Sequence, residues 1–130
     1  MKKLLFTILL FTIFFAGCEK DNYPFEKIIG TWKLVGGYDI MSGGIYSVDT
    51  TEKRMEEYTR DNLRIRYDYL GNEISRCDFR ATESVITIYV KKKDGTEWES
   101  SYDYWFSNDT LKIRNNGGFE FYDEYFIRIE

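Results

Sequence analysis

The residues whose type and spacing come nearest to catalytic chemistry are three carboxylates. Glu97, Glu99 and Asp103 share one parity of a strand-like segment. A glycosidase needs two carboxylates about 5 to 9 Å apart across its substrate, and alternate residues on a strand face lie at about that spacing. Every soluble strand carries such a row, so this pattern alone does not indicate catalysis. We expect that the protein is not an enzyme.

The composition argues against several other chemistries. The chain contains no histidine, and histidine is the commonest metal ligand and the usual general base. We therefore expect no metal site and no cofactor. The net charge of −4 at pH 7 argues against a nucleic-acid partner, which requires a basic stripe. Of the two cysteines, Cys77 shares the parity of Phe79 and is expected to be a buried structural thiol.

A group of aromatic side chains gives the best candidate for a binding site. A buried tyrosine or tryptophan offers a flat apolar body with a polar tip, which suits a sugar ring, a sterol or an aromatic metabolite. The candidates expected to face inward are Tyr67, Tyr69, Trp98, Tyr102, Tyr104 and Phe106, joined by Asp123 on the apolar parity of the last strand. The alternatives are that the rings simply fill a small core and that a bulge at Asp123-Glu124 returns the carboxylate to water.

The N-terminal residues predict export and lipid attachment. Lys2 and Lys3 precede an apolar run, residues 4–16, which is shorter than the roughly 20 residues of a membrane span but typical of a signal peptide. Ala16-Gly17-Cys18 resembles the bacterial lipobox, which implies cleavage before Cys18 and acylation of its thiol. We expect a signal peptide over 1–17 and a lipidated tether over 18–27 that binds the membrane. The alternatives are an ordinary signal peptide or a hydrophobic N-terminal helix.

The residues directly behind Cys18 bear on the location of the protein. Glu19-Lys20-Asp21-Asn22 resembles the acidic, lysine-containing export signals of surface lipoproteins in Bacteroidota. This resemblance implies the cell envelope, with attachment to the outer membrane and display at the cell surface.

Residues 28–130 are predicted to form one all-β domain. Alternating apolar and polar segments recur between turn signals, as is typical of an antiparallel barrel or sandwich. The expected strands are 28–35 resumed at 38–40, 53–59, 62–69, 74–81, 85–91, 98–106, 110–114 and 119–130. About eight strands in sequential hairpins can close into an up-and-down barrel, although periodicity alone does not exclude a sandwich.

Local signals add detail to this prediction. Gly36-Gly37 allows a bulge or bend in the first strand. Residues 41–51 are expected to be the longest loop, and Asp94-Gly95 is expected to form a type I′ hairpin turn. In the segment 62–69, Arg64 and Arg66 are expected on the outer face, because the apolar residues hold the other parity.

Three stretches resemble the lipocalin-like domains of small Bacteroidota lipoproteins: Gly30–Val35, Tyr104–Ile113 and Tyr125–Arg128. The resemblance implies an eight-stranded antiparallel barrel with a central cavity. It also implies that Trp32 closes one end of the barrel beneath an arginine of the last strand, for which Arg128 is the candidate, in a cation–π contact. Because Arg128 is off the parity of Ile127, either the last strand is bulged or Arg128 covers Trp32 from outside.

These observations favour a membrane-anchored binding lipoprotein that holds a small apolar or aromatic ligand inside its barrel. The alternative is a structural or interaction lipoprotein that docks a protein or glycan partner through its outer surface or the 41–51 loop, without a cavity ligand.

Overall fold

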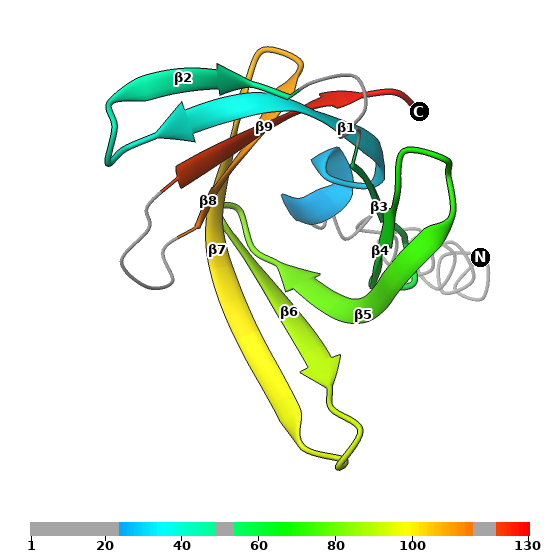
Figure 1. The fold of residues 1–130 in the computed structure, drawn as a ribbon. Helices are drawn as coiled ribbons and strands as arrows, with labels where there is room; N and C mark the ends of the chain where they lie inside the picture. The colour runs from blue at the N-terminus through cyan, green and yellow to red at the C-terminus, as the bar shows by residue number, and fades with distance from the viewer. Residues whose placement is uncertain (1–23, 49–53, 116–121) are drawn as a thin grey trace, which may run out of the picture.

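The computed structural model describes residues 24–48, 54–115 and 122–130, in which an antiparallel sheet closes into a barrel (Figure 1). The short 3-10 helix η1 (Pro24–Lys27) lies across one end. The strands are β1 (Gly30–Asp39), β2 (Gly44–Ser47), β3 (Met55–Tyr58), β4 (Leu63–Tyr67), β5 (Glu73–Ala81), β6 (Val85–Lys91), β7 (Glu97–Ser107), β8 (Thr110–Asn115) and β9 (Tyr122–Arg128). The predicted all-β barrel is confirmed. The expected signal peptide, Cys18 and the first part of the tether lie outside the described residues.

The barrel has eight strand positions because β2 and β3 share one edge of β1. Strand β3 pairs with residues 30–33 of β1 and β2 pairs with residues 36–39. Strands β3 to β9 follow one another in antiparallel hairpins, and β9 pairs with the other edge of β1. This last pairing closes the sheet, so among the described strands the short β2 is the one left at an edge.

Strand β2 corrects one prediction, because it lies inside the segment 41–51 that was expected to be a loop. Small residues favour a turn at residues 39–44, but Ile45 and Tyr46 then pair with the second half of β1. The glycines at 36 and 37 allow this close approach. A Cβ on Gly37 would lie 1.9 Å from the Asp123 carbonyl oxygen and 2.5 Å from the Tyr46 hydroxyl. The register shift expected nearby occurs between Leu34 and Gly36, opposite β9.

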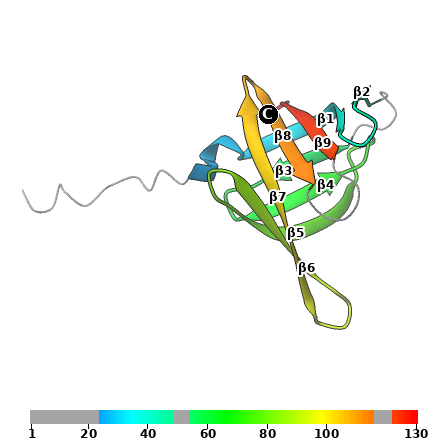
Figure 2. The same cartoon turned by 90° about the vertical axis from the view of Figure 1, so that its left-hand side faces the viewer.

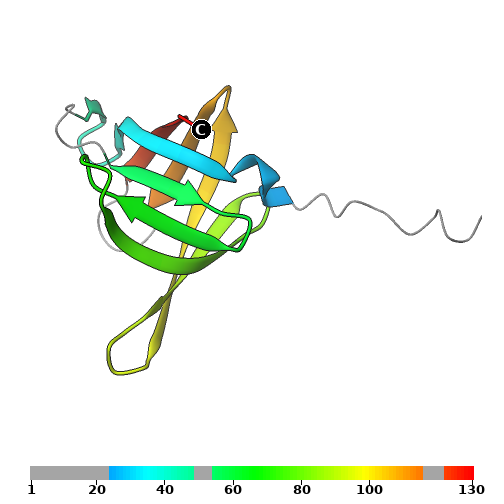
Figure 3. The same cartoon turned by 90° about the vertical axis from the view of Figure 1, so that its right-hand side faces the viewer.

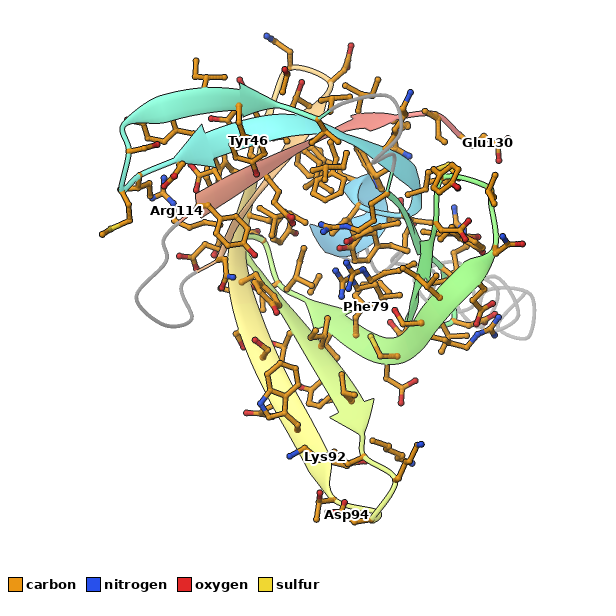
Figure 4. The ribbon with its side chains drawn as sticks, viewed as in Figure 1. Tyr46, Phe79, Lys92, Asp94, Arg114 and Glu130 are labelled. Carbon is orange, nitrogen blue, oxygen red and sulfur yellow. The ribbon has the colours of Figure 1, made fainter. Side chains whose placement is uncertain are left out.

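Hairpin β6–β7 extends beyond the body of the barrel, with Lys92 and Asp94 at its tip (Figures 2 and 4). Its turn differs from the predicted type I′, which requires positive φ at two residues. Here Gly95 has a φ of 84° while Asp94 does not have a positive φ. The Asp94 carboxylate instead accepts hydrogen bonds from the backbone N–H and the hydroxyl of Thr96, which stabilises a longer turn.

The end of the barrel beneath η1, here called the closed end, is filled by aromatic and aliphatic side chains. Trp32 is buried, and its indole Nε1 donates a hydrogen bond of 2.7 Å to the Ile28 carbonyl. The Arg128 guanidinium lies over the indole, with Cζ 4.3 Å from the ring centroid. Gly30 makes room for it, because a Cβ there would lie 2.4 Å from Arg128 Nη1.

The position of Arg128 follows from the register of β9, and both explanations offered from the sequence are wrong. Trp32 pairs with Arg128 and Leu34 with Phe126, so Arg128 and the fully buried Phe126 share the inward parity. Ile127 and Ile129 are exposed. The register irregularity lies in β1 instead of β9. The apolar residues at 127 and 129 had therefore indicated the wrong face.

Helix η1 and the β1–β2 turn lie at opposite ends of the barrel (Figure 3). The end that carries the β1–β2, β4–β5 and β6–β7 turns is called the open end below. Among the described residues, no helix has the length and apolarity needed to cross a membrane.

Candidate functional site

The barrel interior contains a charged cluster centred on Glu56, whose side chain is fully buried. Arg64 donates two hydrogen bonds to this carboxylate, at 2.7 and 3.1 Å, and the Tyr58 hydroxyl donates a third at 2.9 Å. Arg54 lies 3.2 Å from the same carboxylate and makes two hydrogen bonds of 2.7 Å to Glu124. Strands β3, β4 and β9 and the residue before β3 bring these side chains together.

Electrostatics keep the cluster ionised. Burial opposes the charge of Glu56, but Arg64 and Arg54 outweigh it and hold the pKa of the carboxyl below its usual value. Burial also opposes the charge of Arg64, yet Glu56 raises the pKa of that guanidinium. Burial and the nearby Glu56 together raise the pKa of Tyr58 well above its usual value. The network is thus a set of charges held in place by mutual hydrogen bonds.

The buried Nε atoms of Arg54 and Arg66 both lack a hydrogen-bond partner among the described residues, but Arg54 also hydrogen-bonds Glu124, so Arg66 is the less satisfied of the two. Its Nε lies 3.6 Å from Glu56 Oε1, which is too long for a hydrogen bond, and that buried atom has no hydrogen-bond partner among the described residues. Burial lowers the pKa of Arg66, and the neighbouring Arg54 lowers it further. Three guanidinium groups therefore face two carboxylates, Glu56 and Glu124, in the interior.

A cavity of about 370 Å³ lies beside this cluster and opens at the open end. One wall is polar and carries Arg54, Arg64, Arg66 and Glu124. The other wall is apolar and carries Ile86, Ile88, Val90, Trp98, Tyr102 and Ile113. Nitrogen-bearing side chains gather in the interior near the labelled Phe79 (Figure 4). The volume is within the range of about 300 to 1,000 Å³ found for small-molecule sites.

The structure brings only part of the predicted aromatic set to this cavity. Trp98 and Tyr102 line it, and Trp98 is 48% exposed at the mouth. Tyr104 and Phe106 also face inward but pack at the closed end, where Phe106 lies 5.9 Å from Trp32 between ring centroids. The hydroxyl of the buried Tyr104 donates a hydrogen bond to the Thr82 carbonyl. These two rings fill core rather than line the cavity.

Two tyrosines from the set do not face the cavity. Tyr67 pairs with Met55 on the outer face, and its hydroxyl donates a hydrogen bond of 2.7 Å to Glu57. That hydrogen bond, with burial next, raises the pKa of Tyr67 to about 12. Tyr69 lies in the β4–β5 turn and is 59% exposed. The inward orientation expected for both is wrong, because the register of β4 turns Arg64 and Arg66 inward instead.

Asp123 is buried on the outer parity of β9, neither facing the cavity nor returned to water by a bulge. The Arg114 guanidinium donates hydrogen bonds of 2.7 and 2.9 Å to its carboxylate, as expected for a paired buried charge. Tyr46 donates to the Asp123 backbone carbonyl. Burial, followed by Glu124, raises the pKa of Tyr46 to about 12, so this hydroxyl stays protonated at neutral pH.

Of the other residues singled out from the sequence, only Cys77 lies at the cavity, and it is less buried than expected. Cys77 is half-buried on the cavity wall beside Arg64, and burial raises the pKa of its thiol. Glu97, Glu99 and Asp103 lie on the outer face of β7. A hollow of about 940 Å³ on the outside of the barrel includes Arg60, Asp78 and Arg80, but the buried cluster around Glu56 does not line it.

The polar wall of the cavity was not predicted from the sequence. Arg54 and Glu56 share a parity with Tyr58, and Arg64 and Arg66 share one with each other. That pairing of opposite charges on two adjacent strands was the available signal.

Within the described ranges, no group of three or more candidate ligand residues could hold a metal ion. No protein-family model matches the chain, and a search of curated proteins finds no match.

Proposed function

We propose that the protein is a membrane-anchored, lipocalin-like lipoprotein that binds a small organic ligand inside its barrel and has no catalytic role. The observation that carries this proposal is the interior cavity, with an apolar wall of β6, β7 and β8 side chains facing a wall of arginines. Ligand sites typically combine an apolar lining with a few fixed polar groups that orient the ligand.

The placement of η1 supports the anchored part of the proposal. Residue 24, where the described chain begins, lies at the closed end (Figure 3), and Cys18 precedes it by a short stretch. An acylated Cys18 would therefore hold the closed end toward the membrane and leave the mouth accessible from the aqueous side. We propose the outer membrane as its location, with surface display.

Ser75→Phe should weaken binding in the cavity. Ser75 lies on the cavity wall near the mouth, opposite Arg66 on β4, so a phenyl ring would occupy the ligand space without replacing a buried core residue. The probes are hydrocinnamate, octanoate and their amides, titrated by calorimetry and by tryptophan fluorescence. We expect at least about tenfold weaker binding in the variant, equivalent to about 1.4 kcal/mol.

Ser101→Phe is the matched control, because Ser101 lies on the outer face of β7, where its hydroxyl is hydrogen-bonded to the hydroxyl of Thr87. It should bind the probes like the unmodified protein. If no probe binds the unmodified protein, or if Ser75→Phe binds as well as Ser101→Phe, the interior is not a binding site.

Cys18→Ala should abolish lipid attachment. The variant lacks the thiol that would accept the acyl chains, so it should lose nearly all palmitate label. Cys77→Ala should keep the label. The readout is the label, because an uncleaved signal peptide could by itself keep Cys18→Ala on the membrane. A Cys18→Ala variant that still carries palmitate would contradict lipid attachment at this residue.

A second candidate function is partner docking through the β1–β2 hairpin. Large apolar side chains are exposed at its tip, with Met41 72% and Ile45 83% exposed, and β2 is a short edge strand. Such a surface suits a protein partner. This function would take precedence if the probes fail to bind the cavity.

A further inference from the structure

We propose that the cavity selects an organic anion, with its carboxylate held by Arg66 and its apolar body against β6 and β7. This inference rests on the proposed binding function and names the chemical class of the ligand. The basis is the charge inside the barrel, where three arginines face two carboxylates, and not the shape of the cavity.

The Nε atoms of Arg54 and Arg66 are both buried without a hydrogen-bond partner among the described residues, but only Arg54 has a carboxylate that it hydrogen-bonds, Glu124. The Glu56 carboxylate already accepts hydrogen bonds from Arg64 and Tyr58, and both carboxylate oxygens of Glu124 accept from Arg54. Arg66 is held 3.6 Å from Glu56, with its buried Nε unsatisfied. No carboxylate of the described residues lies within hydrogen-bond distance of the Arg66 guanidinium, and an anionic ligand could pair with the part of this group that remains exposed to the cavity.

Access to Arg66 is available from the cavity. Its side chain is 32% exposed, against 14% for Arg64, and it lines the cavity. The facing residue on β5 is the small Ser75, so a carboxylate can approach the guanidinium. A guanidinium presents parallel N–H donors that match a carboxylate in a two-bond geometry.

The opposite wall determines the rest of the ligand. Ile88 and Val90 on β6 and Trp98 on β7 present apolar surface to the same cavity. Arg76, which also lines the cavity, already pairs with Glu73 at 3.0 Å. One anionic group and one compact apolar body therefore fit the site better than a neutral or a polyanionic ligand.

The test compares each acid with its neutral amide. The unmodified protein should bind hydrocinnamate or octanoate about 10- to 100-fold more tightly than the corresponding amide, because hydrogen bonds to a charged group are the stronger ones. Comparison of the two pairs distinguishes an aromatic from a linear body. Arg66→Gln should bring acid and amide to within about threefold of each other, and Arg66→Lys should give an intermediate ratio.

Arg80→Gln is the matched control. It removes the same charge from β5, where Arg80 stacks on Tyr89 outside the barrel, and should leave the preference for the acid unchanged. Thermal unfolding of Arg66→Gln should be unchanged or improved, which separates loss of binding from loss of fold. Equal binding of acid and amide by the unmodified protein would overturn the anion assignment while leaving the cavity function intact. Binding of no probe would overturn both.

Discussion

Glu56→Gln is expected to lower the free energy of unfolding by about 3–5 kcal/mol, as found when one partner of a buried ion pair is removed. The side chain of Glu56 is fully buried and accepts hydrogen bonds from Arg64 and Tyr58. A neutral amide would leave Arg54, Arg64 and Arg66 close together with much less compensating charge. Because small domains are stable by only about 5–15 kcal/mol, the variant should unfold at markedly lower urea concentration.

Glu57→Gln is the matched control for this measurement. Glu57 is the next residue along β3 but lies on the outer face, where it accepts one hydrogen bond from Tyr67. Its loss should cost about 1 kcal/mol or less. Similar urea midpoints for the two variants would contradict the central role of Glu56.

The same carboxylate should make stability depend on pH. Glu56 has a folded pKa below its ordinary value of 4.5. Its contribution is therefore fully present above the unfolded pKa and is lost as the pH falls from there through the lower folded pKa. As the pH is lowered through that window, the urea midpoint of the unmodified protein should decrease, and the urea midpoint of Glu56→Gln should decrease less. Identical slopes would show that another group dominates the acid response.

Trp32→Ala is expected to cost about 3–5 kcal/mol, the usual loss for truncating a buried aromatic side chain. Trp32 is 2% exposed and closes the barrel against Phe106 and Arg128. Its removal also leaves the Ile28 carbonyl without its donor. The melting temperature and the urea midpoint should both fall sharply.

Two further variants make the result specific. Trp105→Ala removes a ring of the same size from the outer parity of β7, where it stacks with Arg114, and should cost less than half as much. Trp32→Phe keeps much of the apolar contact but loses the hydrogen bond of the indole, worth about 1 kcal/mol. A Trp32→Ala variant no less stable than Trp105→Ala would show that the closed end is not the stabilising core.

Much of the barrel was predictable because its signals are local. Turn residues and alternating patterns place β3 to β8 close to where they occur, and antiparallel hairpins follow from short connections. The contact between Trp32 and Arg128 was anticipated from the resemblance. The strand β2 was missed because its pairing with β1 depends on Gly36 and Gly37 across the sheet, not on its own four residues.

The candidate site was less predictable because it depends on which parity of each strand faces inward. In β4, apolar residues at Leu63 and Ile65 indicated one face, whereas the structure turns Arg64 and Arg66 inward. A polar residue can face inward when a partner on the neighbouring strand neutralises it, and Glu56 does so here. Periodicity along one strand contains no information about that partner.

The sequence by itself determined an all-β chain with turns between short strands and without histidine, since these properties depend on residue type and nearest neighbours. Only the tertiary structure decided that β1 and β9 close the barrel and that a charged cluster lies inside it. The physical reason is that a shift of one residue in register exchanges the two faces of a strand. Which register is stable depends on contacts between residues far apart in the chain.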